Sequence, residues 1–136
     1  GLQASREGSQ SGGRIGQGQL VASRPHVGQY FLLGSVRWAM MTGDGRLLAG
    51  IRMMPGRPDP VAARGADATA LKEPYRPAFL LPPVEALNSP ATIVIPPGQF
   101  RAGRTLELVG GPHRQVVLMQ LVDRGLDFDR ATYQPA

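Results

Sequence analysis

The chain has 136 residues, enough for one domain or two small ones with a modest apolar core, and this size excludes a large multidomain enzyme. Glycine and proline supply 31 of the 136 residues, roughly twice their average share, which disfavours a helical bundle or a coiled coil. The absence of cysteine excludes disulfides, iron–sulfur clusters and cysteine nucleophiles, and the net charge of +5 comes from scattered arginines rather than a basic run.

The first half of the chain predicts a lead-in followed by strands. Residues 1–14 are dominated by Gly, Ser and Gln, which indicates a flexible segment with a frayed strand over 2–5. Residues 15–23 predict a short strand entered through a loop. Two apolar segments, 30–41 and 46–54, then flank Thr42-Gly43-Asp44-Gly45, and they predict a hairpin with a two-residue Gly43-Asp44 turn of type II′.

The predicted turn fixes the register of this hairpin. The pairs expected on its buried face are Val36 with Ile51, Trp38 with Ala49, and Met40 with Leu47. Arg37 then lies opposite Gly50 and Arg52 opposite Ser35, so both arginines share the polar face, because side chains alternate along a strand. A shift of one residue would bury the arginines.

The composition changes after the hairpin. Residues 55–77 contain five prolines and few large apolar side chains, which predicts a linker with a turn of helix over 66–72. Beyond it, four short apolar segments predict strands at 78–81, 91–95, 105–109 and 114–122. The first two end at Pro-Pro pairs, which remove amide donors, and Gly110-Gly111-Pro112 predicts a turn between the last two.

Residues 126–133 predict an edge strand or a C-terminal turn. Short strands with frequent turns favour an all-β fold, an antiparallel barrel or sandwich with little helix. The expected organisation is a first β portion over 1–54, a Pro-rich linker over 55–77, and a C-terminal β subdomain over 78–136 that packs on the first portion.

The sequence predicts no catalytic or metal site. The two histidines, His26 and His113, are 87 positions apart, and Asp123, Asp127 and Asp129 lack the glycine and terminal glutamate of a calcium loop. No serine lies in a Gly-x-Ser-x-Gly elbow, and residues 13–18 lack the Lys-Ser/Thr of a phosphate loop. We therefore expect no enzyme activity, no cofactor and no metal.

The sequence also bears on whether the chain binds nucleic acid or a membrane, and on its cellular compartment. Trp38 and Tyr30 fall on the predicted core face, so exposed aromatic rings for nucleic-acid stacking are not expected, although arginine guanidinium groups fit phosphates. The longest charge-free run, 86–100, is broken by prolines and is too short to span a membrane. The N-terminus lacks the pattern of a signal peptide, which favours a cytoplasmic protein or a chain trimmed at that end.

The hairpin also carries a family pattern. Gly34, Val36 and Arg37 on its first strand, with Gly50 and Ile51 on its second and the strand 15–21 before them, resemble the second half of a PilZ domain. This bacterial β-barrel family binds cyclic di-GMP. The resemblance covers residues 1–54, and residues 78–136 look like a C-terminal extension of divergent PilZ-like proteins.

Two features of the family are missing from the sequence. The Arg-x-x-x-Arg and Asp/Asn-x-Ser-x-x-Gly motifs that grip the ligand occur nowhere, so the chain either begins downstream of them or belongs to a divergent member without them. The resemblance implies a non-enzymatic regulatory module of cyclic-di-GMP signalling that contacts another protein or domain. Arg37 and Arg52 are the residues expected to contact a ligand phosphate. The alternative is a nucleotide-independent scaffold in which the Pro-Pro strands pair across a homodimer interface.

Overall fold

The computed structural model describes residues 2–7, 16–23, 31–66 and 73–136. It divides into two compact units, one formed by Gly1–Met54 with Gly125–Asp127, and the other by Pro55–Arg124 with Phe128–Ala136. We call them the sheet unit and the barrel unit. Among the described residues the regular structure is all strand except the 3-10 helix η2 (Glu85–Leu87), which confirms the expected all-β fold. No helix in these ranges is long and apolar enough to cross a membrane.

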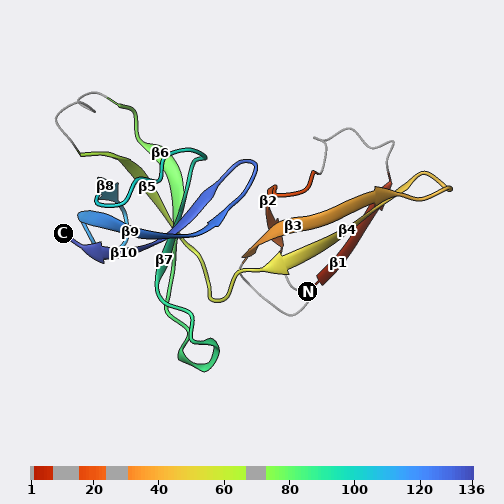
Figure 1. The fold of residues 1–136 in the computed structure, drawn as a ribbon, viewed down its shortest axis with the longest axis horizontal. Helices are drawn as coiled ribbons and strands as arrows, with labels where there is room; N and C mark the ends of the chain where they lie inside the picture. Colours follow the sequence, from red (N-terminus) through yellow and green to blue (C-terminus); the bar gives the residue numbers. More distant parts are fainter. Residues whose placement is uncertain (1, 8–15, 24–30, 67–72) are drawn as a thin grey trace. The chain divides into compact units, whose positions relative to one another are not determined.

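The sheet unit is an antiparallel sheet of four strands in the order β1-β4-β3-β2 (Figure 1). Its strands are β1 (Leu2–Glu7), β2 (Leu20–Ser23), β3 (Leu32–Met41) and β4 (Arg46–Met53). The expected hairpin is therefore present as β3 and β4. Leu33, Val36, Ala49 and Ile51 are its buried apolar side chains near the middle of the sheet.

The predicted register of this hairpin holds only at the end far from the turn. Val36 lies opposite Ile51 as expected, but the register shifts between Val36 and Trp38, so that Trp38 lies opposite Gly50. Arg37 becomes the extra residue of a β-bulge. The predicted burial of Trp38 is wrong, because its side chain is 41% exposed and that of Met40 is 54% exposed.

The turn explains the shift. Thr42 N–H donates to the Arg46 carbonyl at 2.7 Å and Gly45 N–H donates to the Thr42 carbonyl at 3.1 Å, which leaves Gly43-Asp44-Gly45 as a three-residue loop. The left-handed residue is Gly45, with φ of 85°, rather than the first central residue that a type II′ turn requires. One extra loop residue moves every pair near the turn by one position, and the bulge at Arg37 restores the expected register.

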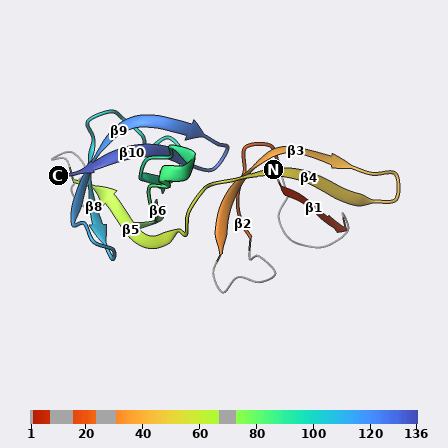
Figure 2. The same ribbon diagram turned by 90° about the horizontal axis from the view of Figure 1, so that it is seen from below.

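The barrel unit is a closed antiparallel barrel of six strands in the order β10-β7-β6-β5-β8-β9 (Figure 1 and Figure 2). Its strands are β5 (Asp59–Gly65), β6 (Arg76–Leu81), β7 (Thr92–Ile95), β8 (Thr105–Val109), β9 (Gln115–Arg124) and β10 (Asp129–Pro135). Strands β6 to β9 confirm the four strands expected after the proline-rich segment, and Pro82 and Pro96 directly follow β6 and β7 as expected.

Two strands of the barrel differ from expectation. Strand β5 lies inside the segment interpreted as a linker, and β10 pairs with both β7 and β9 rather than forming an edge. The prolines of β5 and β6 are compatible with strands because each lies before its strand gains a second neighbour: the β5–β8 ladder begins at Ala62 and the β6–β7 ladder at Phe79. The helical turn expected over 66–72 lies outside the described residues except for Ala66.

Closure of the barrel removes one proposed mode of dimerisation. Strands β6 and β7 each have a paired neighbour on both sides, so neither Pro-Pro strand offers a free edge to a second chain. The barrel interior is filled by alternate apolar residues of all six strands. They are Val61, Ala63, Ala78, Leu80, Ile93, Ile95, Leu106, Leu108, Val116, Leu118 and Ala131. This packed core fixes the backbone beneath the pocket described next.

Candidate functional site

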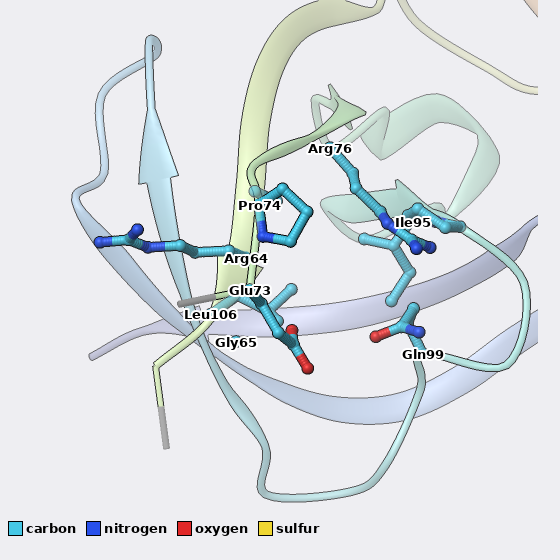
Figure 3. Close-up of a pocket in the computed structure, with 10 residues that line it drawn as sticks. Arg64, Gly65, Glu73, Pro74, Arg76, Ile95, Gln99 and Leu106 are labelled. Atoms are coloured by element: carbon cyan, nitrogen blue, oxygen red, sulfur yellow. The ribbon is translucent and has the colours of Figure 1, made fainter. Parts of the chain in front are cut away.

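A cavity of about 130 Å³ opens on the barrel unit, between the segment before β6 and the ends of β5, β7 and β8 (Figure 3). Its apolar wall includes Pro74, Ile95 and Leu106, and Ile95 and Leu106 are also core residues. Its polar side chains are Arg64, Glu73, Arg76 and Gln99. A cavity of roughly 150 Å³ accepts a benzene ring, so this one is large enough for a single ring system and too small for a whole nucleotide.

A buried arginine, Arg104, connects two of the polar side chains of the pocket. Its Nη1 donates to the Gln99 carbonyl at 3.0 Å and to Gln99 Oε1 at 2.7 Å. Its Nη2 lies 3.4 Å from Glu73 Oε2, and the Arg104 side chain is only 6% exposed. One guanidinium group therefore holds an amide and a carboxylate in fixed positions.

Arg104 is also incompletely satisfied. Its Nε is buried and has no hydrogen-bond partner among the described residues. A buried donor without a partner is destabilising by about 1–3 kcal/mol, so Arg104 is not the choice that stability alone would favour. Residues that break a local rule in this way tend to lie at functional sites.

The segment that carries Glu73 and Pro74 is held from the other side by Arg64. Arg64 and Glu107 are cross-strand partners on β5 and β8, and Arg64 Nε donates to Glu107 Oε2 at 2.8 Å. The Arg64 guanidinium also lies 4.3 Å from the ring centroid of Tyr75, in cation–π geometry. The hydrogen bond to Glu107 raises the pKa of Arg64 above its ordinary value. The Arg64 guanidinium is thus occupied by Glu107 and Tyr75, and these contacts position the rim of the pocket.

Arg76 differs from these two arginines. It lies at the start of β6, it is exposed, and its guanidinium group makes no hydrogen bond or ion pair with any residue that the structure describes. Figure 3 shows its guanidinium beside the Ile95 wall and close to Gln99. Arg76 is therefore the cation of the pocket that is available to an anionic ligand.

A second hollow, of about 560 Å³, lies at the turn between β8 and β9 and is lined in part by Tyr75, Glu107, His113 and Arg114. Tyr75 and Glu107 are already engaged by Arg64, and the His113 ring packs edge-on against Tyr133 at 6.0 Å between centroids. Most of its polar and aromatic groups are thus used within the protein. The smaller pocket has the better developed binding chemistry.

The sequence-predicted site residues lie in the sheet unit. Arg37 and Arg52 are both exposed, on β3 and β4 respectively, and Arg52 lies opposite Ser35 as predicted. The bulge takes Arg37 out of the regular pairing on which the predicted shared face rested. Neither residue lies at the pocket.

Metal-binding candidates are likewise not brought together. Within the described ranges no group of three or more His, Asp or Glu side chains could hold a metal ion, and His26 lies outside those ranges. Asp129 is fully buried, and its carboxylate accepts hydrogen bonds from Phe100 N–H at 3.0 Å and from Arg124 Nε at 3.4 Å. These contacts give Asp129 a structural role.

The pocket residues were not predicted from the sequence, because they lie in segments that were interpreted as connections between strands. Glu73 and Arg76 were assigned to the linker, and Gln99 and Arg104 fall in the connection between two predicted strands. A signal was present in β5, where Val61, Ala63 and Gly65 alternate with Ala62 and Arg64 and are buried on one face. Strand β5 places Arg64 beside the segment that carries Glu73.

Comparisons with known proteins agree with the barrel. The family model of the FimW C-terminal beta-barrel domain matches residues 61–136. The chain is 28% identical over 120 residues to the cyclic-di-GMP receptor FimW of Pseudomonas aeruginosa, and the alignment covers 88% of this chain. It spans only 20% of the length of that relative. No solved structure matches.

Proposed function

Because this chain belongs to the family of FimW C-terminal beta-barrel domains, we propose that it is a non-enzymatic regulatory module that binds cyclic di-GMP. Its relative carries the name of a cyclic-di-GMP receptor, which supports this ligand for the chain. The net charge of +5 favours an anionic ligand through long-range attraction.

The observation that carries the proposal is the pocket of the barrel unit. It lies within residues 63–106, all of which the family model covers, and it combines apolar walls with an available guanidinium on Arg76. An arginine fork can bind a phosphate through two parallel hydrogen bonds. Cyclic di-GMP presents flat bases and phosphates, and the pocket offers a surface for each.

The sheet unit offers an alternative site for a phosphate, at Arg37 and Arg52. Arg37 and Arg52 are both exposed, and Val36 and Ile51, two residues of the PilZ-like pattern, pair directly across β3 and β4. We propose that residues 1–54 are PilZ-like and that the module passes its signal to another protein or domain. The exposed Trp38, Met40 and Met41 of β3 favour such a contact, because large apolar side chains are enriched at interfaces.

Isothermal titration calorimetry of the 136-residue chain with cyclic di-GMP tests the function. We expect saturable binding that Arg76→Ala weakens by about tenfold or more, since a hydrogen bond to a charged group contributes roughly 1.5–3 kcal/mol. Arg46→Ala is the matched control, because Arg46 is an exposed arginine at the hairpin turn.

Further variants distinguish the barrel pocket from the alternative site in the sheet unit. If Arg37→Ala and Arg52→Ala weaken binding while Arg76→Ala does not, the ligand is held by the sheet unit. The absence of any saturable heat with the parent chain would contradict the proposed function itself.

A further inference from the structure

The pocket has a defined order of hydrogen-bonding groups at its polar end. Glu73 contributes a carboxylate, which only accepts hydrogen bonds when it is ionised. Gln99 contributes an amide, whose oxygen is taken by Arg104 Nη1 at 2.7 Å. Because arginine donates and never accepts, the amide atom that faces Arg104 is the oxygen, and the NH2 group of Gln99 is left to donate.

The carboxylate of Glu73 can also accept further hydrogen bonds. Its Oε2 lies 3.4 Å from Arg104 Nη2, and Oε1 has no hydrogen-bond partner among the described residues. Figure 3 shows the end groups of Glu73 and Gln99 at the same end of the pocket, with the Gln99 oxygen turned toward Glu73, its nitrogen turned away, and Pro74, Ile95 and Leu106 near them.

The hydrogen-bonding edge of guanine matches the Gln99 donor and the Glu73 acceptor. Guanine presents a carbonyl acceptor at O6 and donors at N1 and at its 2-amino group, whereas adenine presents a donor at N6 and an acceptor at N1. The Gln99 amide would donate to O6, and the Glu73 carboxylate would accept from N1–H and from the 2-amino group. Adenine in the same position would place its N6 donor against the donor of Gln99 and its N1 acceptor against the carboxylate.

We infer that this pocket is a binding site for one guanine base. Glu73 and Gln99 form hydrogen bonds with the edge of the base, and Arg104 positions both side chains. The inference rests on the proposed function and assigns the base specificity of that site. The cavity of about 130 Å³ takes one base only, so the phosphates and the second guanine of cyclic di-GMP lie outside it, within reach of the exposed rim that carries Arg76.

The test compares cyclic di-GMP with cyclic di-IMP, an analogue that lacks only the 2-amino group of each base. We expect the parent chain to bind cyclic di-GMP about tenfold more tightly by calorimetry, because the analogue cannot make the second hydrogen bond to Glu73. Cyclic di-AMP should bind more weakly than either ligand. Glu73→Gln replaces one acceptor with a donor, and it should reduce the preference over cyclic di-IMP to about twofold or less.

Glu85→Gln is the matched control, because Glu85 is an exposed glutamate of η2 that does not line the pocket. The Glu73 side chain is 45% exposed and the amide oxygen of the introduced glutamine can still accept from Arg104, so the substitution Glu73→Gln should lower the melting temperature of the chain only slightly. The inference is overturned if cyclic di-GMP and cyclic di-IMP bind equally well, or if Glu73→Gln keeps the full preference. In both cases binding of cyclic di-GMP by the parent chain would still support the proposed function, whereas no binding of any ligand would remove both.

Discussion

Gly50 lies directly under the indole ring of Trp38. A Cβ atom added at Gly50 would overlap Nε1 and Cε2 of that ring, so the close approach of strand and ring depends on the missing side chain. The pairing of Trp38 with Gly50 is a product of the bulge at Arg37. It gives the single tryptophan of the chain a fixed position on the open face of the sheet.

Gly50→Ala should therefore displace the indole ring. We expect a red shift of tryptophan emission and a loss of about 1–3 kcal/mol in the free energy of unfolding, the usual effect of overpacking. Gly43→Ala is the control, because no atom lies within 4 Å of a Cβ at that position and its φ is not in the left-handed region. An unchanged emission maximum in Gly50→Ala would contradict the described position of Trp38.

The loop conformation predicts a contrast between its two glycines. Gly45 has a φ of 85°, so Gly45→Ala should destabilise the chain by roughly 1–2 kcal/mol in urea unfolding, whereas Gly43→Ala should be close to neutral. A type II′ turn would require the opposite order, with the larger loss at Gly43. Equal losses in the two variants would not fit the three-residue loop.

The same loop predicts a pH dependence. The Thr42 hydroxyl and then the Arg46 N–H donate to Asp44, and these hydrogen bonds lower the pKa of the Asp44 carboxyl below its ordinary value of 3.8. A lowered pKa in the folded state means that the stabilisation is present above the ordinary pKa and is lost as the pH falls through the lowered one. The Arg46 amide resonance, followed by NMR against pH, should show a midpoint below 3.8, and Asp44→Asn should abolish that transition. A midpoint at or above the ordinary value would be inconsistent with these bonds.

The hairpin shows where sequence reasoning succeeded and where it failed. Apolar alternation identified β3 and β4, and the pairs Val36 with Ile51 and Ser35 with Arg52 were correct, because burial of one face strongly specifies register. The pairs near the turn were wrong, because Thr42-Gly43-Asp44-Gly45 has two glycines and either one can adopt a left-handed conformation. Local sequence does not decide between a two-residue and a three-residue loop here.

The barrel shows a different limit. The strand expected at 105–109 was correct, since Leu106 and Leu108 alternate with Thr105 and Glu107 and are the buried residues of β8. Strand β5 was missed because Pro55, Pro58 and Pro60 suggested a linker, and only the ladder with β8 shows that Pro60 needs no donor on that side. The candidate site depends on β5 and on the contacts of Arg104, which join residues distant in sequence, so it could not be derived from spacing.

Arg104 should act on binding more than on stability. Arg104→Met removes the buried charge and its unpaired Nε together with the hydrogen bonds to Gln99 and Glu73. The Glu73 carboxylate left without its partner is 45% exposed, so water can solvate it and no buried charge remains uncompensated. We expect a small change in melting temperature and a loss of about tenfold or more in cyclic-di-GMP affinity, because Glu73 and Gln99 lose the hydrogen bonds that position them. A large loss of stability with unchanged affinity would make Arg104 a purely structural residue.

The most direct measurement is an NMR titration of the isotopically labelled 136-residue chain with cyclic di-GMP. Binding in the barrel pocket predicts that the largest amide shifts fall on Gly65, Arg76 and Gln99, with Arg37 and Arg52 unaffected or changed only slightly. Shifts concentrated on β3 and β4, or no shifts at saturating ligand, would contradict a binding site in the barrel.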